Sequence, residues 1–239
     1  LLEVLKCFDQ QRRKLADLGQ GLMASMLWDE TNAQKNGSIA REVHFGPLEE
    51  SILSGAHIGT ANPLFNCPNA NCTGNNDNTS VDLAYIPPDY IPRTNYIPRC
   101  TAEEYQDRVP FTPWDTKYTQ EYRLACRKMV DIQGERTLMA ALIPPMVGHT
   151  NGIIGFAFAS QRTLLMTLGA FCSLPFDFFI KVCGKGNLQM NTAGMLPLLD
   201  EEHPMAAEIL CRTAVLNCLT QYYSDFWSRN FRLEFQTIT

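Results

Sequence analysis

The segment YIPPDYIPRTNYIPRC, residues 85–100, constrains the fold more than any other part of the chain, because it contains four prolines. Proline lacks a backbone N–H, and its ring clashes with a preceding helical turn, so this segment cannot form a regular helix or a central strand. The nearby NCPNANCTGNNDNTS, residues 66–80, has the composition of a loop. Long irregular stretches usually bind or cap something. We therefore expect residues 29–116 to form a loop- and proline-rich segment packed on a core.

The pattern of apolar residues becomes regular after residue 116. It predicts a helix over 119–131, strands over 136–145 and 151–160, a buried helix over 162–173 that continues after a proline break, a turn at 184–187, an extended end near 193–200 and a final helix over 204–228. Residues 1–28 have apolar positions near helical spacing and predict one amphipathic helix. The expected fold is α+β: an N-terminal helix (1–28), the segment 29–116, and an α+β core (117–239) that ends in a long helix.

Charge is distributed unevenly along the chain. The net charge of −5 excludes a uniformly basic nucleic-acid binder. Residues 117–190 nevertheless contain eight Lys or Arg against four Asp or Glu, a balance of +4 that leaves −9 on the remainder. The asymmetry indicates one face suited to a polyanion and another suited to water or a protein partner.

The nine cysteines are odd in number, and several lie in apolar runs. Reduced thiols in a cytoplasmic protein are therefore expected rather than a disulfide framework. The apolar stretch 163–180 approaches membrane-spanning length. It contains Gly169, Pro175 and Asp177, so we expect a buried helix and a second element, with no membrane partner. Because residue 1 already lies within a helical pattern, the chain is expected to be part of a larger protein.

The common catalytic motifs are absent from the sequence. It has no G-x-G-x-x-G, no G-x-x-x-x-G-K-[ST], no G-x-S-x-G and no H-E-x-x-H. Cys67, Cys72 and His57 could contribute to a zinc site, but the C-x-x-C pair of most zinc knuckles is missing. No active site can be assigned from the residues alone.

A cationic turn, KVCGKGN, follows the aromatic run of residues 176–179. Lys181 and Lys185 provide charges that suit phosphate oxygens, the glycines allow backbone N–H groups to approach an anion, and Asn187 follows. The same pattern also describes a helix C-cap, in which a glycine ends the helix and lysines satisfy its last carbonyls. Both interpretations remain open at the level of sequence.

A second group of polar residues lies between positions 121 and 151. Arg123 and Arg127 are four residues apart and would share one face of the predicted helix, and Arg136 begins the next strand. His149 and Asn151 close the loop after that strand. Arg and Asn side chains can read base edges and grip phosphates. Alternatively, Glu121, Asp131 and Glu135 could neutralise the arginines.

Several of these pieces, in their order, resemble one family. They are YR-x3-R-x-M (122–129), ERTL (135–138), IPP (143–145), His149, SLPFDFFIKVCGKGNL (173–188) and MLPLLD (195–200), with WDET (28–31), ILSGAHIGTANPLF (52–65), DYIPRTNYIP (89–98) and LNCLTQYYSDFW (216–227). This order is similar to the C-terminal region of large adenine-N6 DNA methyltransferases of restriction–modification and phage-exclusion systems. The resemblance covers most of the chain.

The resemblance implies a target recognition domain that reads a short sequence in double-stranded DNA. A separate methyltransferase domain of the parent chain, which can also be fused to a nuclease, would flip the adenine and methylate it from S-adenosylmethionine. The nearest match to the catalytic motif, NPLF at 62–65, has Leu64 in place of the second proline, so we interpret it as structural. The implied DNA-binding residues are Arg123, Arg127, Arg136, His149, Asn151, Lys181, Lys185 and Asn187, with no catalytic residue, metal or cofactor expected in this chain.

Two other functions remain as hypotheses. The chain could be a protein–protein interaction module of the same defence system, using its acidic remainder and residues 85–100, without contacting DNA. It could also be a complete enzyme, such as a nuclease or a zinc enzyme, built on the cysteines at 67 and 72 and the histidine at 57.

Overall fold

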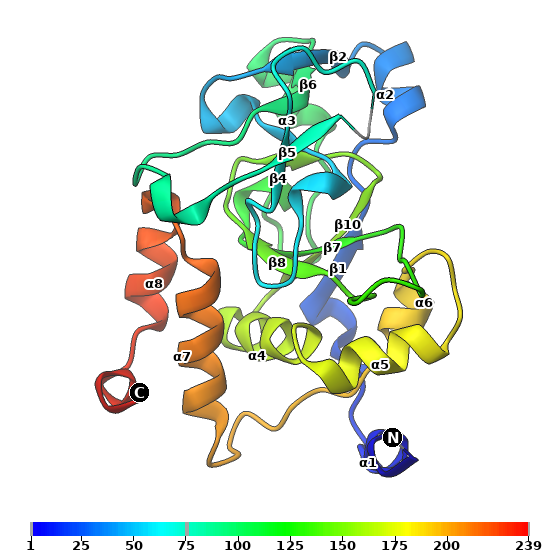
Figure 1. The fold of residues 1–239 in the computed structure, drawn as a ribbon, viewed down its shortest axis with the longest axis vertical. Helices are drawn as coiled ribbons and strands as arrows, with labels where there is room; N and C mark the ends of the chain where they lie inside the picture. The colour runs from blue at the N-terminus through cyan, green and yellow to red at the C-terminus, as the bar shows by residue number, and fades with distance from the viewer. Residues whose placement is uncertain (1, 75–76, 239) are drawn as a thin grey trace.

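Helices and antiparallel strands are mixed along the chain in the computed structural model, which describes residues 2–74 and 77–238 (Figure 1). This confirms the α+β class. Residues 75 and 76 of the predicted loop 66–80 lie outside the described residues. In chain order the elements are α1 (Leu2–Gln10), β1 (Leu22–Ser25), α2 (Glu30–Lys35), β2 (Ile39–His44), β3 (Ile52–Leu53), β4 (Asn66–Pro68), β5 (Asn78–Ser80), β6 (Thr94–Pro98), α3 (Ala102–Arg108), β7 (Arg123–Arg127), β8 (Ala140–Ile143), β9 (Gly148–His149), β10 (Ile153–Phe158), α4 (Gln161–Phe171), α5 (Leu174–Val182), α6 (Met190–Ala193), α7 (Ala206–Asn217) and α8 (Ser224–Asn230).

A four-stranded antiparallel sheet organises the molecule, in the order β1-β10-β7-β8. The two middle strands are buried along almost their whole length, so apolar side chains point to both faces. Leu124 pairs with Phe156 on one side and with Leu142 on the other. These three side chains are fully buried on the face that helices cover.

Helices α4, α5 and α7 cover one face of the sheet (Figure 1). Ser160 caps α4 by accepting a hydrogen bond from the backbone N–H of Thr163. The helix ends at Phe171, and Ser173 is the N-cap residue of α5, which begins at Leu174. Pro175 fits in the first turn of α5, where a missing N–H leaves no hydrogen bond unmade. Phe156, Phe171 and Phe176 form a chain of ring contacts that joins the sheet to both helices.

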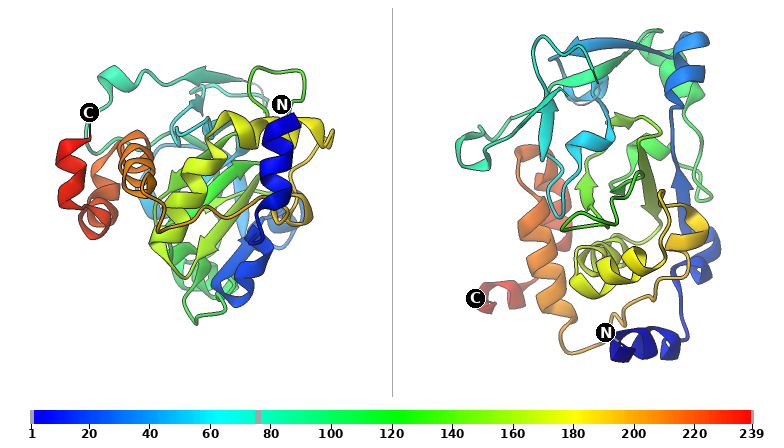
Figure 2. Two further views of the ribbon diagram at one scale, coloured as in Figure 1. Left: turned by 90° about the horizontal axis from the view of Figure 1, so that it is seen from below. Right: turned by 45° about the vertical axis from the view of Figure 1, so that its right-hand side comes forward.

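The irregular segment 29–116 covers the other face of the sheet (Figures 1 and 2). Strand β3 pairs in parallel with β9, and the residues 85–100 extend to the start of α8, where the N–H of Gln221 donates to the carbonyl of Pro88 at 2.8 Å. Small residues line this face of the sheet, among them Ala125, Gly155 and Ala157. The small residues leave room for large polar side chains between the sheet and the segment.

The structure corrects the predicted helix over 119–131, because residues 123–127 form the central strand β7. Arg123 and Arg127 therefore do not share a helix face. They share one face of the sheet instead, since residues separated by an even number of positions point to the same side of a strand.

The predicted N-terminal helix over 1–28 is also wrong. Helix α1 ends at Gln10, a 3-10 helix follows over Leu15–Gly21, and β1 then joins the central sheet. Gly19 has a φ of 51°, a conformation that breaks helical periodicity. The N-terminal region thus contributes a strand to the sheet rather than a separate helix.

The predicted final helix over 204–228 is interrupted. Helix α7 ends at Asn217, a 3-10 turn covers Gln221–Tyr223, and α8 follows. Asn217 is fully buried at the break, where its Oδ1 accepts a hydrogen bond from the N–H of Leu142 at 2.9 Å. The strands predicted within 136–145 and 151–160 and the helices predicted over 162–182 are confirmed.

Within the described residues, no single helix has the length and hydrophobicity to cross a lipid bilayer. The pair α4 and α5 reaches that combination only together, across a 69° bend.

Candidate nucleic-acid interface

Arg123 is the largest of the fully buried side chains and holds the loop that follows β8. Its Nε donates to the carbonyl of Glu121 at 3.0 Å, and its Nη2 donates to the carbonyls of Pro144 and Val147 at 3.0 and 2.7 Å. The guanidinium lies 5.0 Å from the ring centre of Tyr118, a cation–π contact. Arg123 is therefore a structural residue inside the sheet face. The sequence left open that the carboxylate of Glu121 pairs with this arginine. In the structure, backbone carbonyls accept its hydrogen bonds instead.

His149 lies beside this arginine and is also fully buried. Its Nδ1 is 3.2 Å from the carbonyl of Thr150, and its Nε2 is 3.0 Å from the hydroxyl of Tyr118. A carbonyl can only accept, so Nδ1 carries the proton and Nε2 accepts from the tyrosine. Burial and the neighbouring Arg123 charge lower the pKa of His149 to about 3. The ring is thus neutral and does not face solvent.

Arg136 forms a structural pair with a residue of α5. Its Nε is 3.4 Å from Oδ1 of Asp177, and its Nη2 donates to the carbonyl of Cys172 at 2.7 Å. The same Asp177 oxygen accepts the N–H groups of Thr137 and Leu138, each at 2.7 Å. The pair fastens the residues just before β8 to α5. The ion-pair partner of this arginine is Asp177 rather than Asp131 or Glu135.

Arg127 lies at the end of β7 and is partly exposed. Its Nε and Nη2 donate to the carbonyls of Gly55 and Ile58 at 3.1 and 2.9 Å, which fixes the 3-10 turn Gly55–His57 against the sheet. A Cβ on Gly55 would come within 2.9 Å of the carbonyl oxygen of Gly152. Glycine is therefore required where these two backbones meet.

The cationic turn begins as a helix cap. Gly184 has a φ of 63°, and its N–H donates to the carbonyl of Lys181 at 3.2 Å, as expected for a residue that ends a helix. The ammonium of Lys181 donates to the carbonyl of Gly134 at 2.8 Å and supports the loop before β8. The C-cap interpretation is thus confirmed for residues 181–184.

Beyond Gly184 the chain forms a second structure, which we name the paired ridge: residues 128–130 and 185–188. The N–H of Leu188 donates to the carbonyl of Lys128 at 2.8 Å, and the N–H of Val130 donates to the carbonyl of Gly186 at 3.2 Å. Met129 pairs with Asn187 between them. Leu188 is 1% exposed and anchors the ridge in the core, whereas Lys185, Asn187 and Met129 are exposed. The ridge is a short antiparallel ribbon that carries lysines and an amide.

A hollow of about 490 Å³ with several polar side chains in its lining opens beside the paired ridge, and we name it the polar hollow. It is lined by Glu30, Ser54, Gly55, Ala56, Asn95, Tyr96, Arg127, Met129 and Gly152. The hydroxyl of Tyr96 donates to Oε2 of Glu30 at 3.0 Å, and burial, followed by the Glu30 charge, raises the pKa of Tyr96 to about 12. Oδ1 of Asn95 is buried and has no hydrogen-bond partner.

The structure brings together four of the eight residues that the sequence singled out: Arg127 lines the hollow, Asn151 immediately precedes Gly152 of its wall, and Lys185 and Asn187 lie on the ridge. Lys181 lies apart from them in the last turn of α5, where its ammonium donates to the carbonyl of Gly134 in the loop before β8. Nδ2 of Asn151 donates to Oδ2 of Asp29 at 2.7 Å. The other three, Arg123, Arg136 and His149, hold the sheet together. Part of the positive balance of residues 117–190 is therefore inside the protein.

Sequence analysis did not identify Asn95, Tyr96 and Glu30. They lie in different elements, and β6 sits between prolines that indicated only an extended segment. The pieces that contain them, WDET (28–31) and DYIPRTNYIP (89–98), entered only through the resemblance. Their spacing does not bring them together, because the hollow arises from the packing of segments distant in sequence.

The zinc hypothesis finds no support in the described residues, which contain no group of three His, Cys, Asp or Glu side chains placed to hold a metal. His57 is buried, its Nε2 lies 2.9 Å from the carbonyl of Arg93, and its Nδ1 accepts the N–H of Ser54 at 3.0 Å. Burial lowers the pKa of His57, which keeps this hydrogen-bonded ring neutral.

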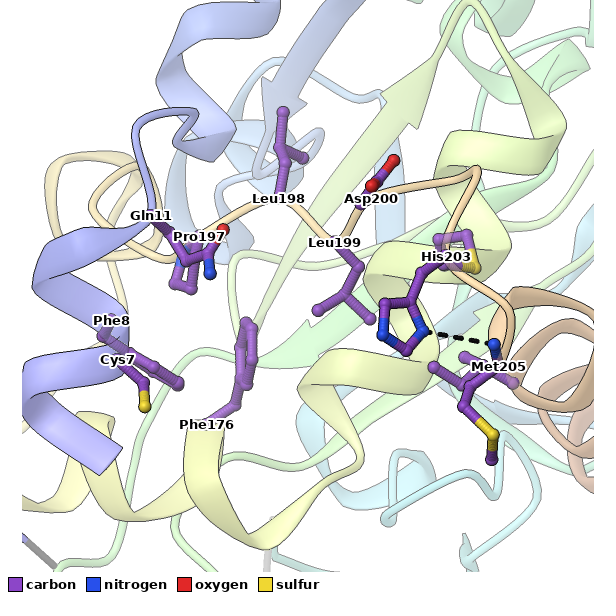
Figure 3. Close-up of a pocket in the computed structure, with 12 residues that line it drawn as sticks. Cys7, Phe8, Gln11, Phe176, Pro197, Leu198, Leu199, Asp200, His203 and Met205 are labelled. Carbon is purple, nitrogen blue, oxygen red and sulfur yellow. Dashed lines mark hydrogen bonds between the residues drawn. The ribbon is translucent and has the colours of Figure 1, made fainter. Parts of the chain in front are cut away.

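A separate apolar pocket of about 320 Å³ lies between α1, α5 and the segment that precedes α7 (Figure 3). On one side of the pocket, the rings of Phe8 and Phe176 meet edge to face, with their centres 4.8 Å apart. Leu199 and His203 lie on the other side. Nδ1 of His203 accepts the N–H of Met205 at 3.1 Å. The pocket contains none of the predicted DNA-binding residues.

No protein-family model matches the chain, and no curated protein matches it significantly.

Proposed function

We propose that the chain is a target recognition domain that binds double-stranded DNA through the paired ridge. The observation that carries the proposal is the antiparallel pairing of residues 128–130 with 185–188, which presents Lys128, Lys185 and Asn187 on one rigid ribbon. The major groove of DNA admits a two-stranded ribbon, lysines contact phosphates as point charges, and asparagine can pair with adenine. Segments supported by a buried core give a recognition surface its precision.

The resemblance to adenine-N6 DNA methyltransferases implies that this binding selects the site of methylation. In the proposed arrangement, a methyltransferase domain of the parent chain holds S-adenosylmethionine and performs the methyl transfer, and the present chain selects the site. The proposed compartment is the cytoplasm, where the DNA of a defence system's host is found. The ridge contributes few positive charges, so the methyltransferase domain would supply further contacts to the DNA backbone.

The experiment is a measurement of binding to a random-sequence duplex across a salt series, with Lys185→Glu compared with wild type. The matched control is Lys6→Glu, the same charge reversal at an exposed position of α1, outside the paired ridge. Wild type is expected to show a slope of log K against log salt near −0.9 for each phosphate contacted. Lys185→Glu should make this slope shallower by the equivalent of about one or more phosphate contacts, while Lys6→Glu should leave the slope unchanged. Equal loss in both variants would assign the binding to overall charge instead of the ridge.

A second candidate, a protein-interaction module, is favoured by the apolar pocket and by the exposed side chain of Met205 at its rim. This function predicts no duplex binding at low salt and a stable complex with a partner subunit. Substituting Met205→Glu would then weaken the complex, whereas the ridge variant Lys185→Glu would not affect it.

A further inference from the structure

We propose that the polar hollow beside the paired ridge binds the base of one unstacked nucleotide, with Asn95 and Glu30 as acceptors for its amino group. The inference rests on the proposed DNA binding and adds to it a site for a single nucleotide. The volume of the hollow, about 490 Å³, lies within the range of roughly 300–1,000 Å³ that is typical of small-ligand sites.

The polar groups of the hollow specify the ligand's chemistry. Asn95 is 4% exposed, and its buried Oδ1 lacks a donor, an uncommon state for a buried acceptor. One oxygen of Glu30 accepts from Tyr96, and a carboxylate can accept further hydrogen bonds. Because both residues line the hollow, their acceptors favour a ligand that brings an amino group, such as adenine, cytosine or guanine.

The lining of the hollow also contains a positive group, because Arg127 lies in it. Arg41, which pairs with Tyr96 across β2 and β6, adds positive charge near the tyrosine. The Arg127 guanidinium suits a ring nitrogen or the phosphate of the same nucleotide. A nucleotide therefore matches the hollow, with its amino group toward Asn95 and Glu30 and an acceptor toward Arg127.

Met129 connects the hollow to the paired ridge, because it lines the hollow and belongs to the ridge. Its side chain is 71% exposed. A thioether makes favourable contacts with aromatic rings, so Met129 can cover a base that enters from DNA lying on the ridge. This continuity favours a nucleotide of the bound DNA over a free small molecule.

The test uses the whole chain and four duplexes of one sequence: a perfect duplex, and duplexes with a single extrahelical adenosine, thymidine or abasic nucleotide. An extrahelical base is already unstacked, so the hollow is expected to bind the adenosine duplex at least about tenfold tighter than the perfect duplex. Thymine lacks an amino group, and the abasic nucleotide lacks a base. For both of these duplexes, the logarithm of the affinity gain over the perfect duplex should therefore be less than half of the value for the adenosine duplex.

Two variants assign the gain to the hollow. Asn95→Leu removes the buried acceptor, and Glu30→Gln replaces a carboxylate oxygen with an amide donor at a partly exposed position. Each should remove the preference for the adenosine duplex while leaving affinity for the perfect duplex within about twofold. Thermal unfolding verifies that each variant is folded, and Glu30→Gln decides the question if Asn95→Leu does not fold.

The outcomes separate this inference from the proposed function. Absence of binding to every duplex overturns both. Binding to the perfect duplex with no gain for extrahelical adenosine overturns the nucleotide site alone. An equal gain for the abasic duplex also overturns it, because the preference would then be for flexible DNA.

Discussion

At the scale of single residues, side chains of the same type differ in burial in this chain. Arg123 is completely buried and Arg127 lies at the edge of a hollow, although both come from one strand. The sequence predicted both as DNA contacts because it shows residue type and spacing but not depth. The burial of polar side chains on this face of the sheet depends on Gly155, where a Cβ would come within 2.1 Å of the Tyr118 hydroxyl and 2.9 Å of Nε2 of His149. That space exists only after distant segments pack together.

The first prediction concerns the buried arginine. Arg123→Leu leaves the carbonyls of Pro144 and Val147 without a donor, so the free energy of unfolding should fall by about 2–4 kcal/mol. Urea unfolding measures the change. Lys185→Ala, at an exposed position, is the control and should change stability by less than about 0.5 kcal/mol. A loss below about 1 kcal/mol for Arg123→Leu would show that these hydrogen bonds are dispensable.

The second prediction is a pH dependence of stability. The pKa of His149 is lowered to about 3 in the folded protein, so the unfolded chain binds more protons between pH 6.5 and 3. Stability should therefore be complete above pH 6.5 and fall with decreasing pH through this window, by up to about 1.4 kcal/mol per pH unit from this residue. Burial lowers the pKa of His57 in the same direction.

The measurement is urea unfolding from pH 7 to 4 for wild type and His149→Gln, since glutamine can both donate and accept but does not titrate. The variant should lose less stability on acidification. Identical pH profiles for the two proteins would exclude His149 as a source of the dependence.

At the scale of secondary structure, the helix wrongly predicted over 119–131 shows where periodicity fails. Leu124, Ala125 and Cys126 are consecutive apolar residues, and such a run fits a buried strand as well as a helix. Arginines four residues apart lie on one face of a helix and also on one face of a strand, so their spacing fits both structures. The neighbours β10 and β8 decide the outcome, because a strand between two partners satisfies its backbone groups on both sides. Strands β8 and β10 were predictable because short apolar runs there end in proline, glycine or serine.

The third prediction separates the two glycines of the cationic turn. Gly184→Ala forces a side chain into a φ of 63°, so it should destabilise the protein by about 1 kcal/mol. Gly186 has no atom near its potential Cβ and no positive φ, so Gly186→Ala should be neutral or slightly stabilising. Thermal unfolding compares the pair. Equal effects would contradict the assignment of Gly184 as the residue that ends α5.

At the scale of the whole molecule, the mixed class and a loop-rich segment over a core were predictable from composition and proline content. The contribution of the N-terminal region to the central sheet was not. Strand β1 pairs with β10 across more than a hundred residues, from Leu22 opposite Phe158 to Ser25 opposite Gly155. Local propensity carries no information about such pairings, and the polar hollow shares this dependence on packing between distant segments.

The fourth prediction follows from this long-range pairing. A fragment of residues 117–239 lacks β1 and the segment that covers the face of Arg123 and His149, so it should not fold cooperatively. Dispersion of amide resonances and a thermal transition of the fragment, compared with those of residues 1–239, measure this. A cooperative transition of the fragment would show that the core is independent of the N-terminal half.

The most direct test of DNA binding through the paired ridge is amide hydrogen exchange with and without a saturating duplex. We predict that protection increases in 128–130 and 185–188 and around the polar hollow, while α1 and the apolar pocket keep their exchange rates. Protection confined to the apolar pocket, or no change at low salt where binding would be strongest, would contradict the proposal.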